Sequence, residues 1–413
     1  MADVVVTGIG LVSALGKNLV DSWQQLLAGK SGIQIHQPFP ELEPRPLGLI
    51  SKQPAQLRTL TQLLVASALQ DAGLIPPLED CGISIGSSRS HQAAWEEMAR
   101  QMYDGKGARG KGQGAMGNGK KTNSQCPIPN AQFPIPNAQF PMPNAHSSWL
   151  DTLPHMNAIA AARQIGATGV VLAPMAACAT GIWAIAQAVL LIQSGQCQRV
   201  LTGAVEAAIT PLTITGFQQM GALAKTGAYP FDLHREGLVL GEGGALFVLE
   251  SAELARQRQA KVYAKILGFG LTADAYHPNA PEPQGKSAIA AIEQCLVRSS
   301  FRPSDIDYIH AHGTATQMND SIESRLIQNL FPQGVPVSST KGATGHTLGA
   351  SGALGVAFSL MALQQQILPP CVGLKQPEFD LDLVREARQA EIRQVLGFSF
   401  GFGGQNAAIA LGN

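Results

Sequence analysis

The residue with the clearest chemical use is Cys178, which stands in the small-residue segment AACATG. A short apolar run at 170–173 precedes it, and apolar residues with the three-and-four spacing of a buried helical face follow it as far as position 192. This order predicts a strand, a tight turn and a helix, with the cysteine at the helix N-terminus. There the helix dipole lowers the pKa of a thiol, and unpaired backbone N–H groups can hold the oxyanion of an attacked thioester.

A cysteine in apolar surroundings is often an inert core residue, so its interpretation depends on other groups. His310 and His312 end a predicted strand in the segment YIHAHGTAT, and Lys341 and His346 lie in the glycine-rich loop STKGATGH. A single histidine in such a place is commonly structural. Histidines and a lysine in turns after strands, in a chain that also presents a cysteine at a helix start, favour a nucleophile with imidazole partners.

Strands and helices alternate along both parts of the chain, which predicts α/β layers. In the first part we expect strands at 4–11, 81–86, 170–173, 199–206 and 245–249, and helices at 19–27, 57–71, 92–103, 156–165 and 182–192. In the second part we expect strands at 261–269, 306–312, 335–338, 395–399 and 407–411, and helices at 287–299, 320–330 and 349–363. A polar segment at 251–261 marks the seam between an N-terminal half, 1–255, and a C-terminal half, 256–413. The similar alternation of strands and helices in the two halves predicts a duplicated βαβ core.

Composition narrows the class of protein. With 413 residues, of which 45% are hydrophobic and 14% charged, the chain can bury a large core. The formal net charge is zero, which argues against nucleic acid as the main partner because no basic excess can neutralise phosphates. The longest apolar runs are too short for a membrane span. The chain opens without a basic, apolar leader, and its six cysteines lack CxxC or metal-ligand spacing, so we expect reduced thiols and a cytoplasmic location.

One region departs from the α/β pattern. Residues 104–125 are rich in glycine and lysine, and residues 127–145 contain the segment PIPNAQF twice and then a shorter copy, PMPNA. A seven-residue period with this much proline is too short for a packed repeat, so we expect 104–146 to be a disordered or extended insertion. Our hypothesis is that the surface tolerates this insertion, so that deletion of 106–146 leaves a folded and active protein.

Six segments together resemble the β-ketoacyl-[acyl carrier protein] synthases I and II, and type II most closely; these are the condensing enzymes of fatty-acid synthesis. The segments are VVVTGIGLVSALG at the start, AACATG around Cys178, PFDLHREGLVLGEGGALFVLE from Pro230, AHGTAT at 311–316, STKGATGHTLGASG at 339–352 and SFGFGGQNAA at 399–408. The resemblance covers nearly the whole chain apart from 104–148. It implies an α/β, thiolase-like fold with a duplicated five-layer αβαβα core and pseudo-twofold halves.

The resemblance implies catalytic roles by position. Cys178 corresponds to the acyl-accepting nucleophile. His312 and His346 correspond to the two histidines that hold the carbonyl of the donor thioester and promote decarboxylation. Lys341 corresponds to a loop lysine with an electrostatic or structural role beside them. An acyl group would transfer to the cysteine, malonyl on a carrier protein would lose carbon dioxide, and the resulting carbanion would extend the acyl chain by two carbons.

The resemblance also implies groups that bind the substrate. The backbone N–H groups of Cys178 and Phe402 would hold the oxyanion, and the Phe402 side chain would be the gate beside the nucleophile. Thr314 and Thr316 would contact the phosphopantetheine arm, and Phe217 would line the acyl tunnel. No metal or redox cofactor is implied, because phosphopantetheine arrives on the acyl carrier protein.

The implied partners are the acyl- and malonyl-loaded carrier protein and a second copy of the chain in a homodimer. The carrier is acidic as a rule, so a basic patch that includes Arg58 is a candidate docking site. Two features depart from the family pattern. His310 stands where the family more often has Asn or Glu, and strand alternation places it on the same face as His312. The region 103–149 replaces a segment that in the family contributes to the subunit interface and the acyl tunnel.

Other functions remain open on the sequence. A polyketide or specialised-lipid ketosynthase shares every one of these motifs. A non-catalytic partner subunit, similar to the chain-length factors, typically lacks the nucleophile that this chain retains. A degradative thiolase uses a second cysteine near its C-terminus, where this chain has GFGGQN, and an initiating synthase of the type III class uses Cys, His and Asn instead of the two histidine motifs.

Overall fold

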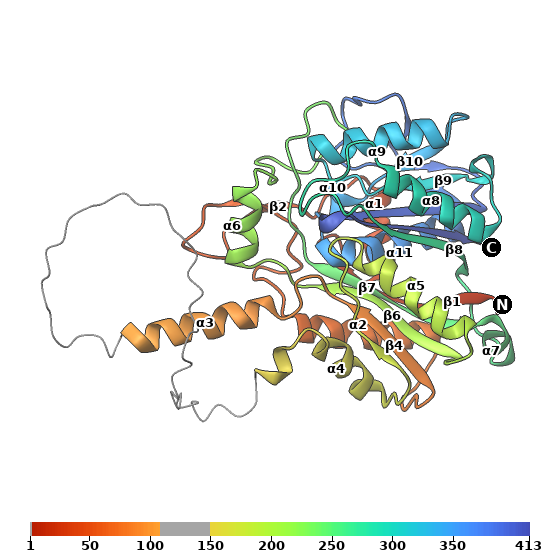
Figure 1. Ribbon diagram of the computed structural model, residues 1–413, viewed down its shortest axis with the longest axis horizontal. Coiled ribbons are helices and arrows are strands. Elements are labelled where there is room, and N and C mark those ends of the chain that lie inside the picture. The colour runs from red at the N-terminus through yellow and green to blue at the C-terminus, as the bar shows by residue number, and fades with distance from the viewer. Residues whose placement is uncertain (1, 108–148) are drawn as a thin grey trace, which may run out of the picture.

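The computed structural model describes residues 2–107 and 149–413 (Figure 1). Its helices are α1 (Leu19–Leu27), α2 (Leu57–Ala72), α3 (Gln92–Gly107), α4 (Met156–Ile165), α5 (Thr180–Gln193), α6 (Pro211–Gln219), α7 (Ala252–Gln257), α8 (Lys286–Ser299), α9 (Gln317–Leu330), α10 (Lys341–Thr344) and α11 (Ser351–Gln365). Its strands are β1 (Val4–Ser13), β2 (Gln34–His36), β3 (Arg45–Leu47), β4 (Cys81–Gly86), β5 (Val171–Leu172), β6 (Arg199–Glu206), β7 (Gly243–Ser251), β8 (Ala264–Ala273), β9 (Tyr308–His310), β10 (Pro336–Ser338), β11 (Ile367–Leu368), β12 (Asp382–Leu383), β13 (Arg388–Gln389), β14 (Gln394–Gly401) and β15 (Gln405–Gly412).

Eleven of the described strands form one mixed sheet whose two halves repeat a single topology, in the order β12-β10-β9-β14-β15-β8-β1-β7-β6-β4-β5. In the first half, β1 is antiparallel to β7, β7 is antiparallel to β6, and β6, β4 and β5 run parallel. In the second half, β8, β15, β14, β9 and β10 follow the same succession of antiparallel and parallel pairs. A short antiparallel pairing between β1 and β8 joins the halves. The predicted duplication of an α/β core is confirmed.

Helices complete the five layers (Figure 1). Helices α2 and α4 pack on the outer face of the first half, and α8 and α9 pack on the outer face of the second. Helices α5 and α11 contact one another between the two halves of the sheet. All residues of α11 from Ser351 to Leu363 are buried, as expected for a helix enclosed by sheet on both sides. The three largest apolar clusters are correspondingly one central cluster and two outer clusters.

Glycines let the first turns of the two central helices touch. A Cβ atom on Gly181 would lie 2.5 Å from the backbone nitrogen of Ala353, and one on Gly352 would lie 3.0 Å from the Ile182 side chain. The first distance is closer than packed atoms allow and the second is unusually tight, so a larger residue at Gly181 would force the helices apart. Because α5 follows the Cys178 turn and α11 follows the His346 loop, this close approach brings those two loops together.

The structure corrects several predicted boundaries. The strand predicted at 306–312 ends at His310, so His312 lies in the loop beyond β9, and the strand predicted at 170–173 is reduced to β5. Helix α3 continues to Gly107, four residues beyond the predicted end at 103. The rest of the predicted insertion, 108–146, lies outside the described residues. Among the described helices, none is both long enough and apolar enough to cross a bilayer.

Candidate active site

The turn before α5 holds Cys178 in a strained and well-fixed backbone. Ala177 has a φ of 46°, in the left-handed region that non-glycine residues rarely adopt. The Thr180 hydroxyl accepts from the N–H of Ala176 at 2.9 Å and donates to the carbonyl of Ala177 at 2.6 Å, which closes the turn. The Ser399 hydroxyl on β14 donates to the carbonyl of Cys178 at 2.8 Å. The cysteine is therefore held from both halves of the protein.

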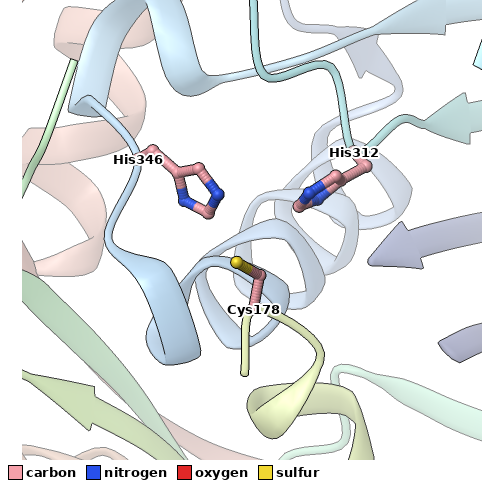
Figure 2. Close-up of side chains that lie close together, drawn as sticks. All are labelled: Cys178, His312 and His346. Carbon is pink, nitrogen blue, oxygen red and sulfur yellow. The ribbon is translucent and has the colours of Figure 1, made fainter. Parts of the chain in front are cut away.

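Two histidines from the C-terminal half face the Cys178 sulfur (Figure 2). His312 comes from the loop after β9 and His346 from the loop between α10 and α11. The sulfur and the ring nitrogens that could act as ligands all lie within 4.8 Å of one another, and the two rings meet edge to face with centroids 5.4 Å apart. The sequence placed these three residues far apart along the chain, and the fold brings them into one buried cluster.

Hydrogen bonds define the protonation of His346. Its Nδ1 accepts from the N–H of Leu348 at 3.1 Å and lies 2.8 Å from the Ser351 hydroxyl. Because a backbone N–H can only donate, Nδ1 must carry a lone pair, and the proton of the neutral ring is assigned to Nε2. The Nε2–H group thus remains as the free donor of this ring.

The neighbour of His312 is Lys341, which can donate or accept a hydrogen bond according to its charge. Its Nδ1 lies 3.4 Å from the Lys341 ammonium, which also donates to the backbone carbonyl of His312. When Lys341 is charged, Nδ1 accepts and Nε2 carries the proton; a neutral lysine amine could accept instead, which frees Nε2 as a base. Burial lowers the pKa of Lys341 to about 8, so both states are accessible near neutral pH.

Two carboxylates on α9 support the His312 loop. Glu323 accepts from the backbone N–H groups of His312 at 2.6 Å and Gly313 at 2.7 Å, and Asp320 accepts from that of Thr314 at 3.0 Å. Burial raises the pKa of Glu323 to about 7 and also raises that of Asp320. Burial, and then the charge of Lys341, holds the pKa values of His312 and His346 well below 6.5. Both imidazoles are therefore neutral at physiological pH.

The thiol itself contradicts one sequence expectation. The position at a helix start predicts a lowered pKa, but burial raises the pKa of Cys178 to about 11. The Lys341 charge and the backbone N–H of Phe402 act in the opposite direction and do not offset the loss of solvent. The prediction was wrong because the helix dipole acts on a sulfur that is almost completely buried. The resting thiol is protonated, and a base must remove its proton.

A cavity of about 390 Å³ opens onto the three residues. Phe217 and Phe402 line it and stack with ring centroids 5.7 Å apart, and Thr314 and Thr316 line its other part with their hydroxyls 2.9 Å from each other. A Cβ atom on Gly401 would lie 2.9 Å from the backbone nitrogen of Cys178, so glycine keeps the approach to that N–H group open.

Two other residues that the sequence analysis names, His310 and Arg58, lie outside this site. His310 is buried below the cavity, where its Nε2 lies 3.2 Å from the Thr340 hydroxyl and its ring packs against Gly355 of α11. Burial lowers its pKa to about 3, and it does not line the cavity. The alternation argument fails because the strand ends at His310 and the chain turns before His312. Arg58 lines a separate surface pocket between α2 and α3, together with Arg100.

The chain matches models of both domains of one protein family. The N-terminal domain model of the beta-ketoacyl synthases matches residues 1–255, and the C-terminal domain model matches residues 263–375. The chain belongs to the beta-ketoacyl synthase family. This synthase is 33% identical to 3-oxoacyl-[acyl-carrier-protein] synthase 2 of Coxiella burnetii, over 99% of the chain and 98% of that relative. It is 31% identical to the protein of the same name from Staphylococcus aureus, over 98% and 97%.

Solved structures of ketosynthases share the whole fold of this synthase. A type II polyketide ketosynthase, in a complex of its carrier protein with the ketosynthase bound to a hexaketide, superposes with a TM-score of 0.86 at 27% identity, over 100% of this chain and 99% of that one. A beta-ketoacyl synthase from Burkholderia phymatum superposes with a TM-score of 0.83 at 26% identity, over 100% of both chains. The thiolase-like architecture expected from the sequence is confirmed.

Cysteine and histidine are also the residue types that bind zinc. The three ligand atoms of Cys178, His312 and His346 are close enough to approach one ion with small movements. The Lys341 ammonium, 3.4 Å from His312 Nδ1, opposes a divalent cation at this point. The residues therefore fit proton transfer and hydrogen-bond donation better than metal ligation.

Sequence reasoning missed Glu323, Asp320 and Ser351, which orient the synthase's two histidines. The available signal was the pair of carboxylates three positions apart in the first turns of the helix predicted at 320–330, directly after AHGTAT. Such a pair at a helix start can accept from the N–H groups of the preceding loop. Ser351 gave no signal, because it lies inside the small-residue helix predicted at 349–363 and nothing in the sequence pairs it with His346.

We expect alkylation of Cys178 in the synthase to accelerate with pH well beyond the range of an ordinary thiol. Because its pKa is raised to about 11, the thiolate fraction increases about tenfold per pH unit from neutral pH to pH ~10. The measurement is the rate of carbamidomethylation of the peptide that contains Cys178, followed by mass spectrometry. A rate that levels off near neutral pH would show a thiolate stabilised by the helix, as the sequence argument predicts.

We expect Glu323→Gln to lower the free energy of unfolding by about 1–3 kcal/mol, because the amide NH₂ would face one of two buried backbone donors. The displaced His312 loop should also slow condensation about tenfold or more. Urea unfolding and the condensation rate check this. Glu386→Gln, at an exposed position, is the matched control and should change neither quantity. Equal stability of the two variants would show that the loop does not depend on the carboxylate.

Proposed function

We propose that this protein is a β-ketoacyl-[acyl carrier protein] synthase that condenses malonyl on the carrier protein with an acyl group on Cys178, with loss of carbon dioxide. The observation that carries the proposal is the cluster of one buried thiol and two neutral imidazoles at the end of a cavity. Family membership and relatives named 3-oxoacyl-[acyl-carrier-protein] synthase 2 support it.

Acyl transfer comes first in the proposed reaction. His312 takes the thiol proton, because its Nδ1 faces a lysine amine that can accept as well as donate. The sulfur attacks the thioester carbonyl, and the backbone N–H groups of Cys178 and Phe402 hold the oxyanion. Each such donor contributes about 3 kcal/mol in comparable sites. When the carbon–sulfur bond of the donor breaks, the leaving pantetheine sulfur takes the proton from His312, which leaves the acyl group on Cys178.

Condensation follows on the same residues. The Nε2–H groups of His312 and His346 donate to the carbonyl oxygen of the malonyl thioester. As the bond to the carboxylate breaks, its electron pair forms an enolate that these donors stabilise, and carbon dioxide leaves. The enolate carbon attacks the acyl carbonyl, the bond to Cys178 breaks, and the released thiolate recovers a proton from solvent. Lys341 stabilises the enolate charge through His312, and Thr314 and Thr316 position the pantetheine arm.

We also propose the remaining properties of the system. The carrier protein is the partner, in keeping with the ketosynthase that superposes in complex with one. The hydrogen bonds from the two histidines stabilise the enolate, so the proposed reaction needs no metal or redox cofactor beyond the carrier's own pantetheine. The edge strand β5, paired on one side with β4, supports a homodimer formed at that edge of the sheet. Reduced cysteines among the described residues support a cytoplasmic location.

One assay tests the proposal. The protein is mixed with carrier proteins that bear acyl groups of several lengths and with malonyl-loaded carrier, and the products are followed by mass spectrometry. We expect acyl-Cys178 and a β-ketoacyl carrier product, with the same yield after treatment with a chelator. Acylation without extension would contradict the roles of the histidines. Absence of both would favour a non-catalytic partner subunit.

A further inference from the structure

An arginine lies behind the aromatic lining of the cavity. Arg89 follows β4, and its backbone N–H donates to Glu206 at 3.1 Å. The same buried carboxylate accepts from Ser87 and Ser88 and, from the C-terminal half, from the N–H of Gly349 at 3.1 Å. These donors occupy both Glu206 oxygens. The backbone of Arg89 is thereby anchored at the junction between the two halves, close to the loop that carries His346.

The Arg89 side chain contacts the aromatic lining of the cavity. Its guanidinium carbon lies 5.6 Å from the centroid of the Phe217 ring, and that ring stacks on the ring of Phe402 with centroids 5.7 Å apart. The charge is near enough to Cys178 to lower the pKa of the thiol, against the larger effect of burial. The guanidinium thus lies against one ring of the aromatic pair that lines the cavity.

The guanidinium of Arg89 differs from those of three other arginines that are at least partly buried. The side chains of Arg199, Arg235 and Arg258 each form an ion pair with a carboxylate. Within residues 2–107 and 149–413, Arg89 has neither a salt bridge nor a hydrogen bond from its guanidinium, and its contact with the ring of Phe217 is a cation–π interaction. Its N–H donors therefore have no partner among these residues, and the guanidinium contacts the cavity lining through the Phe217 ring.

We propose that Arg89 selects acyl groups that carry an oxygen acceptor on the part of the chain remote from the thioester. The proposal rests on the proposed function, because it names the substrate class of that acyl site. A plain alkyl chain that passed the Phe217–Phe402 pair would desolvate the guanidinium without pairing its donors, which costs free energy. A carboxylate or a ketone at that point accepts the N–H groups. Sites built around a hydrogen-bonding group discriminate strongly against analogues that lack the partner.

The test measures the rate at which Cys178 is acylated by pantetheine thioesters of similar length, by intact-protein mass spectrometry. Hexanoyl is compared with adipoyl, which ends in a carboxylate, and with 5-oxohexanoyl, which carries a ketone; acetyl serves as a group too short to reach Arg89. We expect one or both oxygen-bearing groups to react about tenfold faster than hexanoyl, and the faster of the two identifies the acceptor.

Variants link this preference to the side chain. Arg89→Met, which keeps length and removes the donors, should abolish the preference and leave acetyl transfer unchanged, whereas Arg89→Lys should keep part of it. Arg163→Met, at an exposed position on α4, is the matched control. A preference for hexanoyl, or an unchanged preference in Arg89→Met, would overturn this inference alone. Failure of every thioester, acetyl included, would overturn the proposed function as well.

Discussion

Cys178→Ala should lose acyl transfer by about a thousandfold or more while it retains the decarboxylation of malonyl on the carrier protein. Removal of a covalent nucleophile has effects of this size or larger in other enzymes, because the remaining groups cannot form the intermediate. Decarboxylation should persist, because it depends on the donors of His312 and His346, which the substitution does not touch. The two rates are measured separately, as acylated protein by intact mass and as carbon dioxide released from the malonyl thioester.

The matched control is another buried cysteine. Cys197→Ala removes a sulfur that packs in the central apolar cluster and does not line the cavity, so both rates should stay near those of the parent protein. Full acylation of Cys178→Ala would place the acyl group on a different residue. Simultaneous loss of both reactions in a variant that unfolds at the parent's urea concentration would show that the thiol also takes part in decarboxylation.

His346→Ala should show the reverse pattern, with acylation of Cys178 retained and condensation reduced about 10²–10³-fold. Removal of one preorganised donor to a developing oxyanion has this magnitude. The structure assigns the Nε2–H of His346 to that task, since Leu348 and Ser351 occupy its Nδ1. The measurement is the yield of β-ketoacyl product from protein that has already been acylated.

His312→Ala separates the two histidines. Because Lys341 makes His312 the ring that can take the thiol proton, this variant should slow both acylation and condensation. His155→Gln, at an exposed position before α4, should affect neither. Equal slowing of acylation in His312→Ala and His346→Ala would contradict the different roles that their hydrogen bonds assign. Normal condensation in His346→Ala would remove that residue from the mechanism.

Much of the fold could be predicted from the sequence, because it depends on local patterns. The central strands and helices recur with apolar spacing that is independent of their partners, and the segments around α5 and α11 were placed within a few residues. The predicted ends of helices and strands were wrong where tertiary contacts determine them. The strand before His312 ends early because Glu323 captures the backbone N–H groups of His312 and Gly313, which no local pattern reveals.

Local sequence patterns are enough to predict the α/β alternation and the candidate catalytic side chains, which are a cysteine in a small-residue turn and two histidines and a lysine in glycine-rich loops. Their proximity and their protonation states depend on the tertiary structure. The close contact of α5 and α11 brings Cys178 and His346 together, burial keeps the thiol protonated and the imidazoles neutral, and the fold places Arg89 behind Phe217. Protonation and proximity depend on solvent exclusion and on neighbours distant in the chain. These properties exist only in the folded molecule.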